Sequence, residues 1–248
     1  PTSSPRSESF SDDAPFYHLV PKGLVENAEF RKGLIEWGCE SHEAARLLWI
    51  MCRRDLLFFI NSFCFIFEPR PSEDFPFSEF PFITWEFQDR ALLQMARALG
   101  KRDIGVAKSR DQGATWMALV LLFWRWCFYE GESFLLVSRN ADLVDDSNNT
   151  DTLMAKLDQM WNMLPGFLRP PRTRTHMTMV NEHTRSHFNG DTTTGNAGRG
   201  GRRTGVLLDE LASFDVGESF AAWKSLQYVT KTRIWPSTPN GKTGAFYE

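Results

Sequence analysis

The sequence predicts an α/β fold in which helices cover a mainly parallel β-sheet. From residue 83 onward, short apolar segments that fit buried strands alternate with longer segments of helical periodicity. This alternation is typical of parallel sheets, because a helix usually joins one parallel strand to the next. The chain has 248 residues and is 42% hydrophobic, so it can bury a substantial core. The four expected strands are residues 104–107, 134–137, 206–208 and 233–235.

Three helices are expected around these strands. Residues 87–99 have an amphipathic pattern, and residues 115–129 are apolar nearly all round, as in a helix buried against a sheet. Residues 153–164 carry apolar side chains at helical spacing until Pro165-Gly166 ends the pattern. Ahead of the third strand we expect a hairpin of residues 176–180 and 184–188, followed by a loop at 189–203.

The first third of the chain has a different composition and pattern. Residues 1–22 are rich in Ser, Pro and Asp, and we expect a mobile tail there. Residues 24–67 read as two helices, with Ser41 as the cap of the second, and residues 68–82 carry four prolines and form a connector. The expected organisation is therefore a tail at 1–22, a helical lead-in with its connector at 23–82, and a core at 83–248.

Composition excludes several classes of protein. The net charge of −3 argues against a protein that coats nucleic acid by bulk charge. The four cysteines form no CxxC pair, which argues against a zinc site or a disulfide framework. No apolar stretch approaches the roughly 20 residues that a bilayer requires, so we expect no membrane association.

A variant phosphate-binding loop follows the first expected strand. Residues 103–116 read DIGVAKSRDQGATW, whereas the usual pattern, Walker A, is Gly, four residues, then Gly-Lys-Ser/Thr. Gly113 and Thr115 occupy the second Gly and the Ser/Thr positions, but Ala114 stands where the lysine belongs and Lys108 stands at the first Gly. A loop that wraps a triphosphate brings both its ends close to the phosphates, so Lys108 can supply the missing charge. The alternative is an ordinary strand-to-helix turn with solvated charges.

An acidic pair follows the third expected strand. Residues 205–212 read GVLLDELA, so Asp209 and Glu210 come directly after an apolar strand, as in a Walker B pattern. Nucleotide hydrolases use such a pair, in which the first carboxylate holds Mg²⁺ and the second polarises the attacking water. Open α/β sheets bind ligands at the carboxyl ends of their strands, where this pair would lie. The alternative is a solvated acidic turn.

Two further segments carry side chains suited to binding a nucleotide. Ser237 and Thr238 end the fourth strand, where hydroxyl groups can sense a γ-phosphate; the alternative is a simple turn. Just before the first strand, the amide of Gln88 can read both the donor and the acceptor of an adenine edge, with Phe87 against the ring. The alternative is a helix start with Phe87 in the core. An adenine reader, a phosphate loop, an acidic pair and a hydroxyl sensor follow one another in the order found in RecA-like P-loop NTPases.

The chain resembles the large subunit of phage DNA-packaging terminases, in particular its N-terminal ATPase domain. The resemblance covers most of residues 40–248 and rests on SRDQGAT at 109–115, LLDE at 207–210 and STP at 237–239. The stretch RRDLLFFINSFCFIFEP at 53–69 is similar to the helical lead-in of many terminases. Members of this family often have deviant phosphate loops whose lysine comes at the start, as Lys108 does.

The resemblance implies a set of roles. Glu210 would be the catalytic carboxylate, Thr115 and Asp209 would hold Mg²⁺, and Ser237 with Thr238 would couple hydrolysis to movement. ATP and Mg²⁺ are the implied cofactors. Because such terminases carry a C-terminal nuclease domain and this sequence stops at Glu248, we expect a motor without nuclease activity. The implied ATP-binding residues are Phe87, Gln88, Lys108, Ser109, Arg110, Asp111, Gln112, Gly113, Ala114 and Thr115.

Several arginines are candidates for contacts with phosphate groups. In NAGRGGRR at 196–203, Arg199 and Arg202 are candidates for a cation supplied to the γ-phosphate of a neighbouring subunit, and Arg139 is a further candidate. The alternative is a flexible basic loop that contacts DNA phosphates or solvent. Arg169, Arg172 and Arg174 surround Pro170-Pro171; we expect them to flank a turn, and the alternative is contact with DNA.

The resemblance also implies partners. They are double-stranded DNA, a portal protein, a small terminase subunit and further copies of the chain in a ring, in the cytoplasm of the host cell. Two other functions stay open. One is a helicase-like, nucleic-acid-stimulated ATPase. The other is a catalytically silent docking module, which the alanine at position 114 favours.

Overall fold

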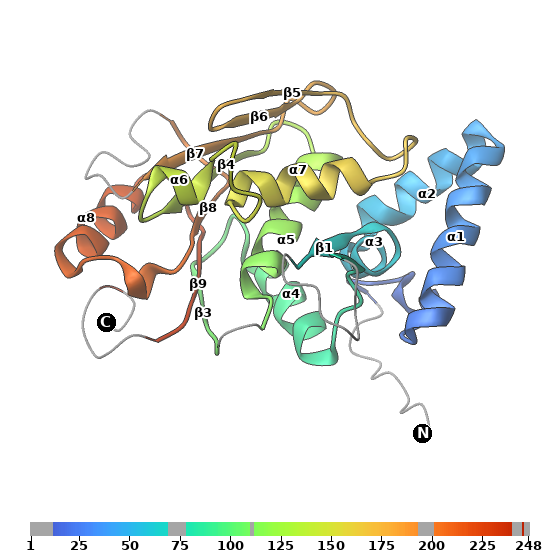
Figure 1. The fold of residues 1–248 in the computed structure, drawn as a ribbon, viewed down its shortest axis with the longest axis horizontal. Helices are drawn as coiled ribbons and strands as arrows, with labels where there is room; N and C mark the ends of the chain where they lie inside the picture. The colour runs from blue at the N-terminus through green and yellow to red at the C-terminus, as the bar shows by residue number, and fades with distance from the viewer. Residues whose placement is uncertain (1–11, 69–77, 110–111, 193–200, 240–244, 246–248) are drawn as a thin grey trace. The chain divides into compact units, whose positions relative to one another are not determined.

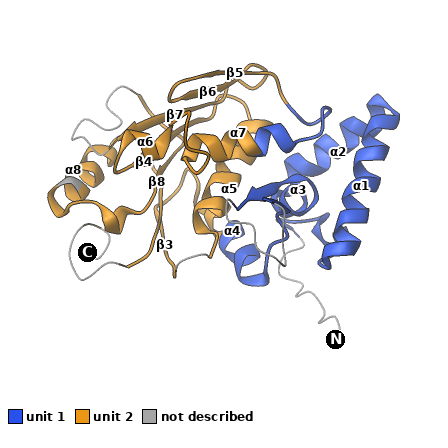
Figure 2. Cartoon of the chain, in the orientation of Figure 1, with its two compact units in different colours: residues 1–93, 160–169 blue, residues 94–159, 170–248 orange. Residues whose placement is uncertain are grey.

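The computed structural model describes residues 12–68, 78–109, 112–192, 201–239 and 245. The chain divides into two compact units, coloured separately in Figure 2. Unit 1 comprises Pro1–Leu93 and Met160–Arg169, and unit 2 comprises Gln94–Gln159 and Pro170–Glu248. No helix among the described residues is long and apolar enough to cross a membrane.

Residues 24–67, in unit 1, form three helices where the sequence indicated two. They are α1 (Leu24–Glu40), α2 (His42–Arg54) and α3 (Leu56–Phe63). Ser41 caps α2 as predicted, since its Oγ accepts the main-chain N–H of Ala44 at 3.1 Å. The prediction of one continuous second helix is wrong, because Asp55 is extended and its carboxylate accepts the N–H of Phe58, which starts α3. Strands β1 (Phe65–Phe67) and β2 (Glu79–Pro81) then pair antiparallel.

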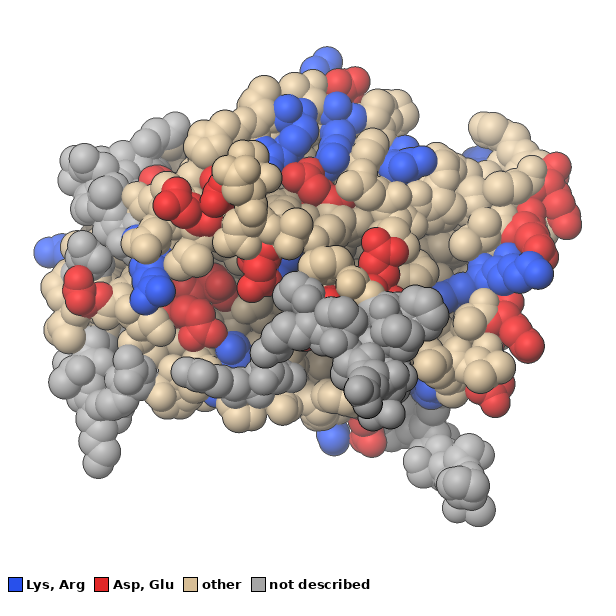
Figure 3. Space-filling view, viewed as in Figure 1, with Lys and Arg blue, Asp and Glu red and all other residues tan. Residues whose placement is uncertain are grey.

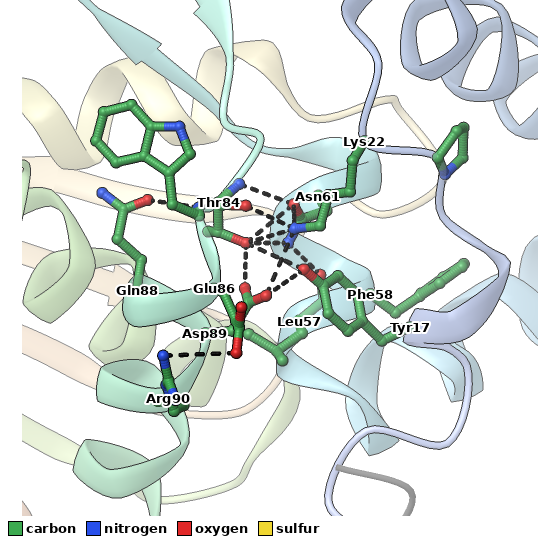
Figure 4. A network of polar contacts seen from close by, with 12 residues as sticks. Tyr17, Lys22, Leu57, Phe58, Asn61, Thr84, Glu86, Gln88, Asp89 and Arg90 are labelled. Carbon is green, nitrogen blue, oxygen red and sulfur yellow. Dashed lines mark hydrogen bonds and ion pairs between the residues drawn. The ribbon is translucent and has the colours of Figure 1, made fainter. Parts of the chain in front are cut away.

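A buried polar network joins three segments of unit 1 (Figure 4). Tyr17, in the short 3₁₀ helix η2 (Tyr17–Leu19), donates its hydroxyl to Asp89 Oδ2 at 2.6 Å. Thr84 bonds to both Asn61 of α3 and Asp89 of α4 (Glu86–Ala98), and Lys22 donates to the main-chain oxygen of Thr84 at 2.6 Å. Residues 17–22, within the expected tail, therefore hold the start of α4 against α3.

Unit 2 is built on a seven-stranded sheet, with the strand order β3-β9-β8-β4-β7-β6-β5 (Figure 1). The first five strands in this order run parallel, whereas β6 and β5 are antiparallel additions at one edge. The prediction of a mainly parallel sheet is thus confirmed. The strands are β3 (Ile104–Ala107), β4 (Ser133–Ser138), β5 (Arg172–Thr175), β6 (Thr178–Asn181), β7 (His187–Thr192), β8 (Gly205–Leu208) and β9 (Arg233–Ser237).

Helices cover both faces of this sheet, which explains why its central strands are apolar throughout. Successive side chains of a strand point to opposite faces. On one face, Leu135 and Val137 of β4 pack with Leu226 of α8 (Val216–Leu226). On the other face, Phe134 packs on Phe188, which also contacts Trp126 of α5 (Ala114–Phe128). Both faces are buried, so β4 and β8 show none of the alternation of a half-exposed strand.

The remaining elements of unit 2 include both predicted and unexpected ones. Helix α7 (Leu153–Met163) and the pairing of β6 with β7 are as predicted. The bounds of the second strand are not, because Arg185 has a left-handed backbone with a φ of 59° and β7 runs from His187 to Thr192, into the expected loop. Arg172 and Arg174, expected to flank a turn at Pro170-Pro171, lie in β5, which starts directly after these prolines and was not predicted. Three further elements were not predicted: α6 (Ala141–Val144), the 3₁₀ helix η3 (Leu211–Ser213) and α8.

Pairing with acids explains how arginines occupy β5. Arg172 and Arg174 both pair with Asp158 of α7, and Arg174 also pairs with Asp145 at 2.7 Å. The Asp145 carboxyl is partly buried, which opposes ionisation, but hydrogen bonds from Arg174 and Met177 lower its pKa below the usual value. Basic side chains gather over this hairpin in Figure 3, with acidic ones beside them.

Candidate functional site

Five of the predicted site residues meet at one edge of the unit 2 sheet. Strands β3, β9 and β8 are parallel neighbours, so their carboxyl ends lie at the same edge. Lys108 follows β3, Asp209 and Glu210 follow β8, and Ser237 with Thr238 ends β9. The strand order therefore brings together residues that are up to 130 positions apart in the sequence.

An ion pair lies at the centre of this cluster. Lys108 Nζ is 2.7 Å from Glu210 Oε1, and the two side chains are 12% and 35% exposed. The main chain of Lys108 is fixed as well, because its N–H donates to Ser237 O at 3.1 Å and extends the pairing of β3 with β9. The displaced lysine of the phosphate loop thus reaches the acidic pair from a rigid strand end.

Glu210 has an unusual backbone. Its φ of 54° and ψ of 44° are left-handed, a conformation that is costly for a residue with a side chain and is concentrated at functional sites. Its N–H donates to Pro236 O at 3.1 Å, and its Oε2 lies 3.3 Å from the N–H of Thr238 and 3.4 Å from Ser237 Oγ. Both carboxylate oxygens of Glu210 are therefore held by the ends of neighbouring strands.

Asp209 and Thr115 form the second half of the cluster. Thr115 Oγ1 donates to Asp209 Oδ1 at 2.8 Å. Thr115 lies in the first turn of α5, which Gly113 opens with a φ of 69°, a conformation that glycine adopts at little cost. Burial raises the pKa of Asp209 to about 6, although the Thr115 hydrogen bond opposes the rise.

The chemistry of this pair suits a magnesium ion. Mg²⁺ prefers hard oxygen ligands and in nucleotide sites takes one or two from the protein, with phosphate and water completing the shell. A hydroxyl and a carboxylate oxygen are already adjacent here. No larger group of His, Cys, Asp or Glu that could hold a metal occurs in the described part of the chain.

Lys156 of α7 was missed by the sequence reasoning. It is buried, and its Nζ binds the main-chain oxygen and carboxylate of Asp151 and lies 5.8 Å from the centre of the Trp116 ring. Its positive charge lowers the pKa of Asp209, against the effect of burial. In the sequence, Lys156 is one polar residue beside the apolar positions of a helix, and no local pattern indicates that it lies close to Asp209.

The other predicted residues have different positions. Ser109 is exposed. Gln112 lies just before α5, and Ala114 is the first residue of that helix. Arg110, Asp111 and Arg199 fall outside the described residues. Arg202 precedes β8, at the opposite end of that strand from the acidic pair. Arg139 is exposed directly after β4, at the same edge of the sheet as the cluster.

The expected adenine-reading residues belong to unit 1. Phe87 is 44% exposed, so it is not the core side chain of the alternative interpretation, and its ring lies 5.6 Å from that of Trp85. Gln88 is buried, and its Oε1 accepts the N–H of Trp85 at 3.0 Å, which fixes the direction of the amide (Figure 4).

Comparison with known proteins finds likeness in structure. No family model matches the chain, and no curated protein matches its sequence. The large terminase of bacteriophage HK97 matches with a TM-score of 0.51 and 14% identity, over 74% of this chain and 37% of that protein. The Thermus phage P74-26 large terminase ATPase domain matches at 0.47 and 18%, over 63% of this chain and 66% of that one.

A further match is the large terminase of a thermophilic bacteriophage in complex with ADP, at a TM-score of 0.44 and 13% identity over 62% of this chain and 38% of that one. The likeness to the HK97 protein, at this identity, concerns the fold. It confirms the predicted likeness to the fold of a phage large terminase, and the mainly parallel, helix-covered sheet agrees with the predicted fold class.

Proposed function

We propose that this chain is the ATP-hydrolysing motor domain of a phage terminase and moves double-stranded DNA into a procapsid. The observation that carries the proposal is the meeting of Lys108, Thr115, Asp209 and Glu210 at the carboxyl edge of three parallel strands. A cation, a hydroxyl and two carboxylates with separate partners are the groups that phosphoryl transfer to water requires. The matched region spans only part of the HK97 protein, so the activity of the whole motor is part of the proposal.

The ion pair suggests how the site responds to nucleotide. The phosphates of ATP compete with Glu210 for the Lys108 ammonium group, since both are anions. Once Lys108 turns to the phosphates, Glu210 is released to orient a water molecule for in-line attack on the γ-phosphate. Bound with the nucleotide, Mg²⁺ would offset charge on the β- and γ-phosphates, and Thr115 with Asp209 would hold it. The N-terminus of α5 adds main-chain N–H groups near the phosphates.

Ser237 and Thr238 are suited to report the state of the site. Both lie against Glu210 Oε2, and Ser237 Oγ also accepts the N–H of Ala212 at 3.0 Å. A shift of Glu210 during hydrolysis therefore changes contacts at the end of β9 and in η3. We propose that this shift moves a DNA-gripping surface. Contacts to DNA would be mostly to phosphates and hence sequence-independent and salt-sensitive.

Assembly belongs to the same proposal. The working form would be a ring of copies docked on a portal protein with a small terminase subunit, and Arg199, Arg202 or Arg139 would complete the site of a neighbouring copy. Phe87 and Gln88 would bind adenine. A silent docking module is the second candidate, because Ala114 leaves the usual lysine position empty.

Phosphate release from ATP tests this proposal. We expect slow Mg²⁺-dependent turnover by the wild type and a loss of about a hundredfold or more in Lys108→Ala, because that ammonium group meets the developing charge. Lys32→Ala is the matched control, since Lys32 is exposed and pairs with Glu36 on α1. An unchanged rate in Lys108→Ala would refute the role of this lysine, and no wild-type turnover in the assembled ring would favour the docking module.

A further inference from the structure

An open cavity of about 490 Å³ lies at the other end of the same three strands. Its lining comes from residue 100, residues 202–204 and residues 227–231, which immediately precede β3, β8 and β9. It therefore lies at the amino edge of the sheet, whereas the Lys108–Glu210 cluster lies at the carboxyl edge. Strands of this length separate the two edges by about 15 Å. Of its lining residues, Arg202 is also one of the three candidates for the cation supplied to a neighbouring copy, whereas Tyr228 and Lys231 have no part in the proposed function.

Hydrogen bonds between the three segments fix the walls of this cavity. The N–H of Arg203 donates to Val229 O at 2.8 Å, and Thr230 Oγ1 lies 3.4 Å from Thr204 O. The N–H of Gly100 donates to Thr232 Oγ1 at 2.7 Å. The three segments are thus held together by one main-chain hydrogen bond and by the hydroxyls of two threonines.

The charged side chains that line the cavity share one sign. Among the described residues that line the cavity, Arg202, Arg203 and Lys231 are cationic and none is acidic. Ser133 and Asn189 hold the Arg203 guanidinium from behind, at 2.8 and 2.7 Å. Arg202 and Lys231 are exposed, and no ion pair engages either of them within the described part of the chain.

Two neighbouring features favour an anionic ligand further. Asp103, the acid at the start of β3, is already paired with Arg233. Tyr228 is 87% exposed at the cavity and offers both a flat apolar ring and a hydroxyl. Such a side chain can pack on a sugar and donate to a phosphate oxygen, which Arg and Lys also bind.

We propose that this cavity binds backbone phosphates of double-stranded DNA, with Lys231, Arg202 and Tyr228 as the contacting residues. The inference rests on the proposed function, because that function makes DNA the substrate. With a net charge of only −3, a chain that binds a polyanion needs a local basic surface, and the cavity provides one. DNA would then contact the amino edge while ATP occupies the carboxyl edge of the same strands.

Fluorescence anisotropy of a labelled, blunt-ended duplex tests the site. Relative to the wild type, we expect Lys231→Ala to weaken binding several-fold and to reduce the slope of log affinity against log salt by about one, because one phosphate contact is lost. Lys231→Glu should weaken binding about tenfold or more. Tyr228→Ala should weaken binding, and Tyr228→Phe should retain the contribution of the ring. Lys32→Ala and Lys32→Glu are the matched controls on α1.

The outcomes separate this site from the proposed function. ATP turnover without DNA should be unchanged in Lys231→Glu, while stimulation by DNA is lost. If the wild type hydrolyses ATP and Lys231→Glu still binds duplex with wild-type affinity and salt slope, the cavity proposal is overturned and the motor proposal stands. If Lys231→Glu loses affinity for poly-glutamate but not for duplex, the cavity binds an acidic protein segment, which also overturns it. A wild type that binds no duplex contradicts both proposals.

Discussion

Two polar clusters in this chain are built from similar groups but have different roles: one is suited to stability and the other to binding a ligand. In unit 1, the network of Tyr17, Asn61, Thr84 and Asp89 is closed, and Asp89 is only 3% exposed. In unit 2, the cluster around Lys108 and Glu210 lies at a sheet edge, where the Glu210 side chain is 35% exposed. A closed network has its hydrogen bonds satisfied within the protein and contributes rigidity. An open cluster keeps charged groups within reach of a ligand.

The difference predicts how substitutions divide between activity and stability. Changes in the unit 1 network should lower the free energy of unfolding, because they leave buried polar groups without partners. Changes in the unit 2 cluster should mainly lower the rate of the reaction, because water can reach the groups that lose a partner. Substitutions of Glu210 and Asn61 test this division, and the pH dependence of Asp55 tests a second buried carboxylate of unit 1.

Glu210→Gln should have the largest effect. Without the carboxylate that orients water, we expect ATP turnover to fall about a thousandfold, equivalent to about 4 kcal/mol of barrier. The free energy of unfolding should change by no more than about 1 kcal/mol, since Gln still accepts a hydrogen bond from Lys108 and partly exposed ion pairs contribute little. Phosphate release and urea unfolding measure the two quantities, with Glu36→Gln of α1 as the control.

An unfolding free energy reduced by several kcal/mol in Glu210→Gln would contradict the comparison, because the open cluster would then be a structural element like the closed one.

Asn61→Leu should have the next effect, on stability. The Asn61 amide accepts the N–H of Thr84 at 2.9 Å and donates to Leu57 O at 2.8 Å, both in the buried interior. Leucine is similar in size but leaves these groups without partners, so we expect the free energy of unfolding to fall by about 3–4 kcal/mol. Urea unfolding measures it. The exposed Asn162 provides the control Asn162→Leu, which should unfold like the wild type.

Asp55 should make stability depend on pH. Burial raises its pKa from 3.8 to about 6, although the N–H groups of Phe16, Tyr17 and Phe58 favour the ionised form. Between these two values the folded protein holds a proton that the unfolded chain has released. Stability therefore falls as pH rises from about 4 to about 6 and is level above, by no more than about 3 kcal/mol.

Urea unfolding of wild type and Asp55→Asn across this pH range measures the effect. The variant should lose this part of the pH dependence, and an identical slope in both proteins would assign it to other groups.

The sequence predicted the parts of the fold that depend on local pattern. Strands β4 and β8 and the buried helix α5 were found because continuous apolar runs reflect burial on both faces. The break at Asp55 was missed because helical periodicity continues through it. Strand β5 was missed because its arginines are neutralised by Asp158 of α7 and by Asp145, which directly follows α6, and no local pattern reveals this pairing.

The candidate site, like the fold, has parts that the sequence predicted and parts that it did not. The meeting of Lys108 with Glu210, and of Thr115 with Asp209, could be anticipated, because ordered motifs at strand ends converge once the strands are parallel neighbours. The influence of Lys156 on Asp209 acts through space from another helix. The amino-edge cavity is likewise formed by three distant segments, so only the folded chain brings Arg202 and Lys231 together.

The displacement of one lysine within the phosphate loop is the central claim, and a crystal structure with a non-hydrolysable ATP analogue and Mg²⁺ tests it most directly. We expect Lys108 Nζ to leave Glu210 and to contact the β- and γ-phosphates within hydrogen-bond distance. A bound analogue with Lys108 still paired to Glu210, or turned away from the phosphates, would contradict it.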